Sequence, residues 1–378
     1  MIARQLKLPA GSYFLLGPRG TGKSTWIRET VKRALWIDLL KESTFAELSG
    51  RAERIEAMAD AKRATTIVID EVQKLPSLLD EVHRLIETRN FRFILTGSSA
   101  RKLRRSGSNL LAGRARSLTM HPFTTSELGS KFELRRAIRY GLLPTVWDKT
   151  GDASEYLKSY VGTYLREEVQ QEALVRNIGS FSRFLEAASF SQAAVLNVVS
   201  VAADCGINRK TVENHFDLLE DLLLAVRLPV FRRKAARKLV AHPKFFFFDA
   251  GVYRAIRPRG PLDSSADVDG AAIETLLFES LRAENANHGY DYAFSYWRLA
   301  DGTEVDFVAY GERGLHAFEV TRSSVFRESD LKGLRLFCAD YPSAEGHLFY
   351  GGTRSYRFGA IEVLPFEEGL RALAKTLK

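Results

Sequence analysis

The sequence is poor in cysteine and in long apolar runs. Its two cysteines, Cys205 and Cys338, lie far apart, so they provide neither a disulfide framework nor a cluster of metal ligands. Residues Met1 to Leu8 contain no apolar signal core, and runs such as Phe245 to Phe248 are much shorter than a membrane span. These absences predict a soluble, cytoplasmic protein with no membrane partner.

Positive charge, in contrast, is in excess. The 378 residues include 55 Lys and Arg against 46 Asp and Glu, which gives a formal net charge of +9. This surplus favours a polyanionic partner, although many basic proteins have none. The length favours two or three domains. Two acid-free stretches concentrate the basic residues: Arg92, Arg101, Lys102, Arg104, Arg105, Arg114 and Arg116 in the first, and Arg227, Arg232, Arg233, Lys234, Arg237, Lys238 and Lys244 in the second.

A glycine-rich loop joins the apolar run Ser12–Leu16 to a helix-like segment that begins at Thr25. It fits the P-loop pattern G-x-x-x-x-G-K-[ST], in which backbone N–H groups and a helix N-terminus surround phosphates. Lys23 is expected to reach the β- and γ-phosphates, and the Ser24 hydroxyl to hold Mg²⁺. The predicted nucleotide-binding residues are Gly17, Pro18, Arg19, Gly20, Thr21, Gly22, Lys23, Ser24 and Thr25.

A second run, Thr65–Ile69, is β-branched and ends in Asp70 and Glu71. Such an apolar run is typical of a strand buried on both faces of a parallel sheet, and its acids then lie at the carboxyl edge beside the P-loop. The pattern has the form of a Walker B element. Asp70 is predicted to order Mg²⁺ through its water shell, and Glu71 to polarise the attacking water.

Further polar residues follow the next apolar strand, at Phe91–Ser99. Thr96 and Ser98 are candidates for a contact to the attacking water or the γ-phosphate, with simple loop capping as the alternative. Arg114 or Arg116 is a candidate arginine finger for a neighbouring subunit, with a solvated or phosphate-binding basic loop as the alternative.

These motifs together resemble the AAA-type ATPases that carry a C-terminal DUF4143 domain. The resemblance implies an α/β protein with an N-terminal P-loop AAA+ parallel sheet, ATP and Mg²⁺ as cofactors, and self-association into a homo-oligomer, for which a hexamer is the family-level expectation. It assigns the sensor 1 role to Thr96 or Ser98. The motifs that carry it are Gly17–Ser24, Val68–Pro76, Leu95–Ser99, Leu111–Ala115, His121–Leu128 and Arg139–Pro144.

The middle of the chain predicts an amphipathic helix over Ser154–Leu174 and a helix-turn-helix over Leu196–Leu219, with a tight turn at Gly206 and a cap at Asn208. Two strands of a wing are expected at 224–230 and 241–248. This winged helix either binds DNA or serves as a lid or oligomerisation module. For Arg166, a surface salt bridge is favoured over a sensing role. The candidate nucleic-acid contacts are Arg209, Lys210, Arg232, Arg233, Lys234, Arg237 and Lys238.

The C-terminal block predicts a helix at 271–285 followed by three strands. Glu274, Asp306 and Glu319 occur in the order of a PD-(D/E)xK nuclease fold, in which acids hold Mg²⁺ and a lysine activates water. That lysine is replaced by Thr321, so a degenerate, nuclease-like fold used for binding or assembly is favoured over cleavage. Asp249 is expected to cap the helix that it precedes.

The expected organisation is an ATPase domain at 1–130, a helical, winged-helix domain at 131–256 and an α/β nuclease-like domain at 257–378. The leading functional prediction is a Mg²⁺-dependent AAA+ ATPase coupled to the binding or remodelling of DNA, including branched DNA. Two alternatives remain open: an ATP-controlled signalling or defence assembly that binds a protein, and a metal-dependent nuclease.

Overall fold

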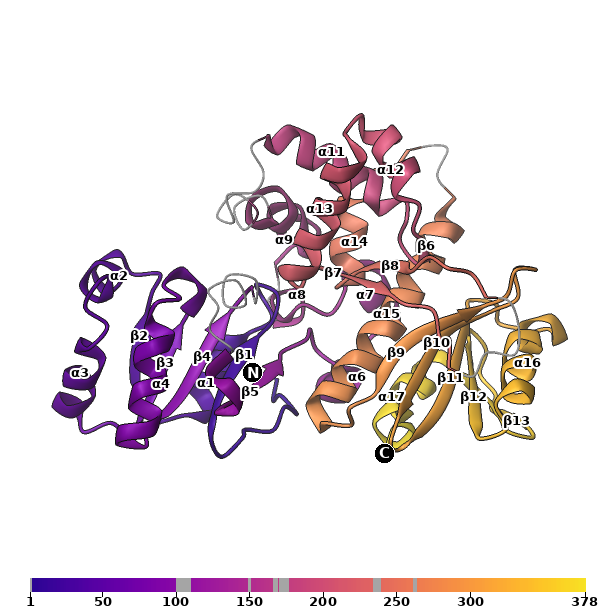
Figure 1. The fold of residues 1–378 in the computed structure, drawn as a ribbon. Coiled ribbons are helices and arrows are strands. Elements are labelled where there is room, and N and C mark those ends of the chain that lie inside the picture. The colour runs from indigo at the N-terminus through magenta and orange to yellow at the C-terminus, as the bar shows by residue number, and fades with distance from the viewer. Residues whose placement is uncertain are drawn as a thin grey trace. The chain divides into compact units, whose positions relative to one another are not determined.

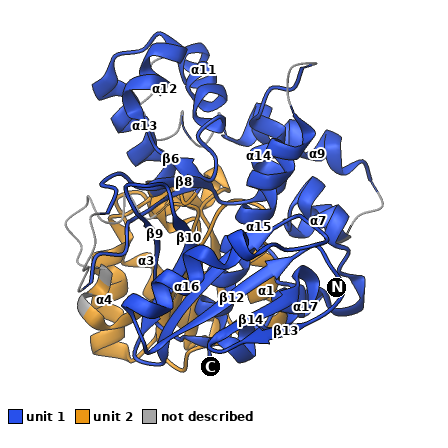
Figure 2. Cartoon of the chain, turned by 90° about the vertical axis from the view of Figure 1, so that its right-hand side faces the viewer, with its two compact units in different colours: residues 1–5, 122–220, 224–378 blue, residues 6–121, 221–223 orange. Residues whose placement is uncertain are grey.

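The computed structural model of the chain describes residues 2–99, 110–148, 151–165, 169, 177–233, 239–260 and 264–378. The chain divides into two compact units, coloured separately in Figure 2. The smaller consists of residues 6–121 with 221–223, and the larger of residues 1–5, 122–220 and 224–378. The predicted middle and C-terminal domains therefore lie together in the larger unit.

The smaller unit is built on a five-stranded, all-parallel sheet with the order β2-β3-β4-β1-β5. Strand β1 and all but the first residue of β3 and of β4 are buried, as expected for continuous apolar strands covered on both faces. The elements are β1 (Ser12–Leu16), α1 (Lys23–Thr30), β2 (Leu35–Asp38), α2 (Glu42–Leu48), α3 (Arg54–Lys62), β3 (Thr66–Asp70), α4 (Leu78–Arg89), β4 (Arg92–Gly97) and β5 (Ala115–Thr119).

The strand order decides which chain segments meet at the carboxyl edge of this sheet. Strand β4 lies between β1 and β3, so the loop after β1, the acids after β3 and the hydroxyls after β4 are neighbours in space (Figure 1). Ligands of open α/β sheets bind at such an edge. The predicted N-terminal parallel sheet of P-loop type is thus confirmed.

The middle region contains the predicted helix-turn-helix and wing. Helix α12 (Val198–Cys205) is followed by its cap residue Gly206, whose φ of 63° is left-handed, and the Asn208 side chain accepts the Lys210 N–H at 2.8 Å. Strands β6, β8 and β7 form a three-stranded antiparallel sheet. The elements are α6 (Thr125–Leu128), α7 (Leu134–Tyr140), α8 (Pro144–Asp148), α9 (Ala153–Ser159), α11 (Ile178–Ser189), β6 (Ala194–Val195), α12 (Val198–Cys205), α13 (Arg209–Asp221), β7 (Ala225–Leu228), β8 (Lys244–Phe247) and α14 (Ala250–Ile256).

One helix of this region differs from its prediction. The helix expected over 154–174 is α-helical from Ala153 to Ser159, π-helical over Tyr160–Tyr164 and α-helical again at Leu165 and Val169. Rings of Tyr156, Tyr160 and Tyr164 lie about one turn apart, with neighbouring centroids separated by 6.1 and 5.9 Å. Periodicity alone does not distinguish a π turn from an α turn over so short a stretch. Arg166 lies outside the described residues.

The C-terminal region is a six-stranded mixed sheet with the order β13-β14-β12-β11-β10-β9. Helices α15 and α17 pack with Phe307 and Phe318 in one apolar cluster, and α16 packs with Val308 and Ala317 in another. The elements are α15 (Ser265–His288), β9 (Ala293–Arg298), β10 (Glu304–Gly311), β11 (Gly314–Thr321), α16 (Lys332–Asp340), β12 (Ala344–Tyr350), β13 (Tyr356–Phe358), β14 (Ile361–Pro365) and α17 (Phe366–Thr376).

Helix α15 begins six residues before the predicted start at 271, because Ser264 caps it by accepting the N–H of Ala266 at 3.2 Å. None of the helices that the structure describes has the length and apolarity needed to cross a bilayer.

Candidate functional site

The P-loop has the backbone that its glycines predict. Gly20 and Gly22 have φ values of 85° and 88°, in the left-handed region that favours glycine. A Cβ atom on Gly17 would lie 2.4 Å from the carbonyl oxygen of Met120, so a larger residue does not fit there. The Thr21 hydroxyl closes the loop by donating to the Pro18 carbonyl at 2.9 Å. The loop therefore leads directly into α1, whose N-terminus carries Lys23 and Ser24.

The ammonium group of Lys23 is held by the loop itself. Its Nζ donates to the carbonyl oxygens of Gly17 at 2.8 Å and Pro18 at 3.1 Å, and the side chain is buried. Carbonyl dipoles orient the ammonium without neutralising its full charge. These contacts hold the ammonium group at the start of α1, beside the glycine-rich loop.

Asp70 connects three elements of the smaller unit. Its Oδ1 accepts a hydrogen bond from Ser24 Oγ at 3.0 Å and a second from the Thr96 hydroxyl. Ser24 belongs to α1, Asp70 to β3 and Thr96 to β4. A hydroxyl and a carboxylate in contact are the oxygen ligands that Mg²⁺ prefers, so the residues present fit that ion.

Glu71 is fixed by its backbone and by one amide side chain. Its φ of 59° and ψ of 47° are left-handed, which is uncommon for a residue with a Cβ atom. Its N–H donates to Thr96 Oγ1 at 3.2 Å. The Gln73 amide donates both to the Glu71 carboxylate and to Ser98 Oγ, the latter at 3.0 Å.

Gln73 is a site residue that the sequence did not reveal. It is buried on the turn after β3, and a Cβ atom on Gly97 would lie 2.6 Å from its Oε1. An isolated glutamine two residues after an acid carries no motif signal of its own. Thr96 and Ser98 are both brought to the acids, Thr96 through Asp70 and Ser98 through Gln73.

The arginine-finger candidates lie at β5. Arg114 forms an ion pair with Glu87 of the same unit, and the Arg114 side chain is 37% exposed. The Arg114 guanidinium lowers the pKa of the Glu87 carboxyl. Arg116 is exposed on β5. Of the first basic stretch, Arg92 donates to the Pro9 and Gly11 carbonyls, whereas Arg101, Lys102, Arg104 and Arg105 lie outside the described residues.

The candidate nucleic-acid contacts on the winged helix are largely paired within the chain. Arg209 and Lys210 are exposed and both lie beside Glu213, at 3.0 and 3.6 Å. Arg232 donates to the Ala241 carbonyl at 3.1 Å, and the Arg233 guanidinium lies 4.5 Å from the ring centroid of Tyr310. Lys234, Arg237 and Lys238 lie outside the described residues.

The acids of the nuclease-like cluster meet around a lysine from another region of the chain. Lys244, in β8, is 2% exposed and its Nζ lies 3.2 Å from Asp306, 3.6 Å from Glu304 and 3.8 Å from Glu274. Glu319 is hydrogen-bonded to Asp306. The sequence showed Lys244 only as the flank of a phenylalanine run, and nothing in its spacing linked it to acids so far downstream.

Burial and the neighbouring charges together determine which groups of this cluster are protonated. Burial, with the negative charge of Asp306 second, raises the pKa of Glu274 and of Glu319 well above the ordinary value. Burial lowers the pKa of Lys244, but the surrounding carboxylates outweigh that effect and raise it overall. Lys244 is therefore an ammonium ion and a poor general base.

Asp249 does more than cap a helix. Its two carboxylate oxygens accept the N–H groups of Val252 at 2.9 Å and of Leu142 at 2.8 Å. Gly141 permits this approach, because a Cβ atom there would lie 2.1 Å from Asp249 Oδ1. Burial raises the pKa of Asp249 to about 6. The turn at 141–144 and the segment from Asp249, which the sequence showed as separate signatures, thus form one contact.

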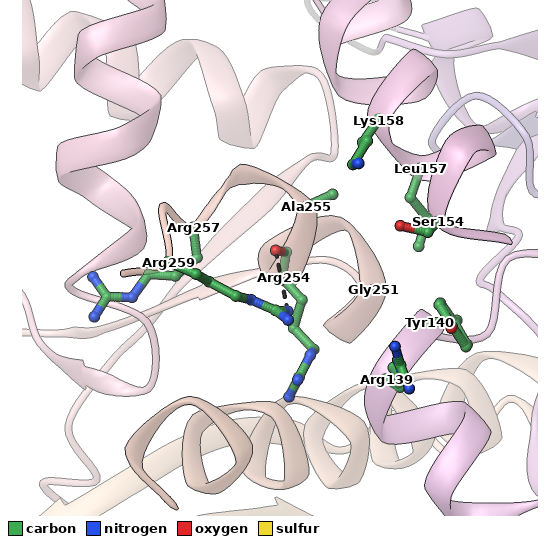
Figure 3. A pocket seen from close by; sticks show the side chains of 10 residues that line it. All are labelled: Arg139, Tyr140, Ser154, Leu157, Lys158, Gly251, Arg254, Ala255, Arg257 and Arg259. Atoms are coloured by element: carbon green, nitrogen blue, oxygen red, sulfur yellow. Dashed lines mark hydrogen bonds between the residues drawn. The ribbon is translucent and has the colours of Figure 1, made fainter. Parts of the chain in front are cut away.

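A strongly basic pocket lies between α7, α9 and the end of α14. Its volume is about 350 Å³, and its lining contributes five cationic side chains, Arg139, Lys158, Arg254, Arg257 and Arg259 (Figure 3). A neighbouring hollow of about 410 Å³ shares three of these arginines and adds Arg135, Arg322 and Asp269. Among the described residues that line the two hollows, Asp269 carries the sole negative charge.

The arginines of this pocket influence one another. Arg254 and Arg322 both pair with Asp269, and Arg259 donates to the Arg254 carbonyl at 3.4 Å, the dashed line in Figure 3. Burial, followed by the positive charges of Arg254 and Arg139, lowers the pKa of Arg259. Crowded cations that outnumber nearby acids favour an anionic ligand. Residue spacing did not reveal this pocket, because α7, α9 and α14 are separated in sequence.

Comparison with known families gives a match at each end of the chain. Residues 10–129 match the family described as AAA domain, and residues 269–368 match DUF4143, a domain of unknown function. Residues 131–263 match a further domain of unknown function, DUF8612. The chain thus matches an AAA domain at its N-terminal end and a DUF4143 domain at its C-terminal end, the combination that its motifs predicted.

Similar proteins add little about activity. Uncharacterized proteins of Mycobacterium tuberculosis and Mycobacterium bovis are each 24% identical over 351 residues, which cover 90% of this chain and 77% of theirs. A solved structure of the replication initiator DnaA bound to AMPPCP and single-stranded DNA is 14% identical and covers 56% of this chain and 82% of its own, with a TM-score of 0.28. So low a score carries no argument about function.

Proposed function

We propose that this protein is a Mg²⁺-dependent ATPase whose turnover is coupled to nucleic acid. The observation that carries the first half is the set of hydrogen bonds from Ser24 and Thr96 to Asp70, which joins the P-loop helix to the two strands beside it. Ser24 and Asp70 are the proposed Mg²⁺ ligands, Asp70 through water. When bound, Mg²⁺ neutralises charge that develops on the phosphate oxygens.

Each remaining site residue has a proposed role. Lys23 turns its ammonium from the loop carbonyls toward the β- and γ-phosphates, while the backbone N–H groups of residues 20–25 surround them. Glu71 accepts a proton from the attacking water, and Gln73 holds its carboxylate in place by a hydrogen bond. Thr96 and Ser98 complete the polar edge as sensor residues.

The experiment that tests the ATPase proposal measures phosphate release by the full chain and by Lys23→Ala. Lys32→Ala, which changes an exposed lysine just beyond α1, is the matched control. We expect turnover to be abolished in Lys23→Ala and kept in Lys32→Ala. Equal turnover in the two variants would refute the assignment.

The second half of the proposal, coupling to DNA, is supported by the basic pocket rather than by α13, the second helix of the helix-turn-helix and hence its candidate recognition helix. Arg209 and Lys210 share one carboxylate, whereas five cationic residues line the pocket of Figure 3. Phosphate contacts of this kind dominate affinity for DNA and make it depend on salt. We infer that the pocket contacts the DNA backbone, with branched DNA a candidate substrate.

Charge-reversal variants test which of two surfaces binds DNA, the basic pocket or the helix-turn-helix. DNA binding at low ionic strength is measured for Arg139→Glu combined with Arg259→Glu, and for Arg209→Glu combined with Lys210→Glu. We expect the first pair to weaken binding at least about tenfold and to reduce the salt slope by about 1 for each phosphate that the variant no longer neutralises. A larger effect in the second pair would instead identify the recognition helix.

Turnover with and without DNA then tests the coupling. Stimulation by DNA that is absent from the pocket variants supports a DNA-dependent ATPase. If duplex, single-stranded and branched DNA all leave turnover unchanged, an ATP-controlled assembly that binds a protein becomes the favoured function.

The C-terminal acid cluster is a different case. We infer that its acids are neutralised internally by Lys244 and that cleavage is not its role. Thr321 occupies the expected lysine position, and Lys244 is too firmly protonated to activate water as a base. Metal-dependent cleavage of DNA that Glu319→Ala abolishes would contradict this inference.

A further inference from the structure

Two buried histidines face one another on neighbouring strands of the C-terminal sheet. Strands β11 and β12 are parallel neighbours, and in their register His316 is the partner of Glu345 and Phe318 is the partner of His347. Residues two apart on a strand share a face, so both imidazoles and the Glu345 carboxylate lie on one side of the sheet. The His316 and His347 side chains are 7% and 6% exposed, whereas that of Glu345 is 64% exposed.

The nitrogen and oxygen atoms of these three side chains lie about as far apart as the ligands of one metal ion do. His316 Nδ1 lies 3.4 Å from His347 Nε2 and 3.9 Å from Glu345 Oε2. Two nitrogens bound at the usual zinc–nitrogen length in a tetrahedron are about 3.3–3.4 Å apart. One ligand atom from each of the three residues lies within 4.8 Å of the others. The exposed Glu345 side chain has room to close the remaining gap.

The outer nitrogens of the two rings also face suitable partners. The second nitrogen of His316, Nε2, lies 3.2 Å from the Tyr292 hydroxyl. That of His347, Nδ1, is buried, and the nearest carboxylate oxygen among the described residues, on Glu362, lies 3.6 Å away. Metal-bound histidines usually donate their other ring N–H to such oxygens, which fixes the tautomer and directs the remaining lone pair at the metal.

We propose that His316, Glu345 and His347 bind one divalent metal ion of the zinc class. Three protein ligands leave a fourth position for water or a ligand group, and two imidazoles with one carboxylate suit Zn²⁺ and Co²⁺ better than Mg²⁺. Tyr292 and Glu362 act as positioning residues through the two rings. The site is separate in sequence and in chemistry from the P-loop, so it does not depend on the proposed ATPase activity.

An ordinary structural role is the competing explanation. Imidazoles 3.4 Å apart also form an N–H···N hydrogen bond, and His347 stacks on Phe318 with centroids 4.8 Å apart. Burial and the neighbouring His347 lower the pKa of His316 to about 4, so the His316 ring is neutral near pH 7 under either explanation. Metal binding itself therefore has to be measured.

The test titrates Zn²⁺ into the full chain, prepared without a histidine tag, by calorimetry, and follows Co²⁺ by its tetrahedral visible absorption. We expect one metal ion per chain, and a rise in Tm with zinc concentration. His347→Asn should weaken binding at least about 100-fold, and the positioning variant Glu362→Gln about 10–100-fold. His242→Asn, at an exposed histidine, is the matched control and should bind as the wild type does.

Two further variants keep the proposal falsifiable. Glu345→Gln changes an exposed side chain and leaves the fold intact, so weaker zinc binding there cannot be attributed to unfolding. Lys23→Ala should bind zinc normally, which separates this site from the nucleotide site. The proposal is overturned if the wild type takes up no stoichiometric zinc, or if His347→Asn and Glu345→Gln bind it as tightly as His242→Asn does.

Discussion

The P-loop and the acid cluster both contain a buried lysine, and the two lysines have different partners. Lys23 donates to the carbonyl oxygens of Gly17 and Pro18, six and five residues away. Lys244 faces full negative charges, including Asp306 at a separation of 62 residues. Carbonyl dipoles leave most of an ammonium's positive potential available to an incoming anion, whereas carboxylates neutralise it. The role proposed for Lys23 is phosphate binding, whereas Lys244 compensates the charge of the acids around it.

The largest expected effect comes from removing the compensating charge. Lys244→Met leaves Asp306, Glu304 and Glu274 without their cation, and should lower the free energy of unfolding by about 3–5 kcal/mol. Urea unfolding against Lys332→Met, an exposed lysine, provides the measurement and its control. A decrease below about 1 kcal/mol would show that solvent, rather than Lys244, compensates the acids.

The loss of stability in Lys244→Met should also depend on pH. The folded-state pKa values of Glu274 and Glu319 are raised above 4.5, so the folded protein binds more protons there than the unfolded chain. Their contribution to stability therefore falls as the pH rises above that value. Without Lys244 the acids repel one another further, so the destabilisation in Lys244→Met should be greater at about pH 8 than at about pH 5. A pH-independent effect would contradict this account.

At the P-loop site the strongest effect should fall on turnover. Glu71→Gln removes the proposed base but keeps the shape of the side chain, so we expect ATP to bind and phosphate release to fall about 100- to 1,000-fold. Binding of a fluorescent ATP analogue and steady-state hydrolysis measure the two steps. The control is Glu53→Gln at an exposed position before α3. Unchanged hydrolysis would remove Glu71 from the mechanism.

Gln73 should have a smaller effect, because it acts through Glu71. Gln73→Ala leaves the Glu71 carboxylate without the hydrogen bond that holds it, and turnover should fall about tenfold, or about 1.4 kcal/mol of transition-state stabilisation. The pH profile of kcat distinguishes positioning from a failure to fold, since it shifts only if the Glu71 environment changes. Lys74→Ala, at the exposed neighbour, should show neither effect.

Arg114 should have the smallest effect on stability. Its exposed ion pair with Glu87 is screened by solvent, so Arg114→Ala should leave the free energy of unfolding nearly unchanged. The proposed arginine finger in a homo-oligomer makes a separate prediction, a fall in turnover seen only at concentrations where subunits associate. Solution scattering with bound nucleotide measures the association. A fall in turnover at all concentrations would exclude a finger.

The sequence placed the P-loop, the acids and the hydroxyls at one edge of the sheet because each of these parts is local. The P-loop, the acids after β3 and the hydroxyls after β4 each follow one strand, and a parallel sheet brings the carboxyl ends of its strands to one edge. Gln73 escaped prediction because an amide that holds another side chain leaves no spacing signal. The π-helical turn at 160–164 escaped because its periodicity differs little from that of an α-helix over five residues.

The C-terminal region was less predictable, because its contacts join distant segments. The order of Glu274, Asp306 and Glu319 was read from the sequence, but the identity of their cation depended on β8 lying against them. The His316–His347 pair similarly depends on the register of β11 with β12, which no local pattern encodes.

The sequence by itself determined the parallel sheet, the P-loop and the acids beside it, because strand-to-loop motifs carry the local geometry of that edge. Only the tertiary structure decided which lysine neutralises the C-terminal acids, which arginines converge on the basic pocket and which histidines face each other. The physical reason is that charge pairing and ligand geometry depend on distances of a few ångströms between side chains, and for segments far apart in the chain only the packed fold sets those distances.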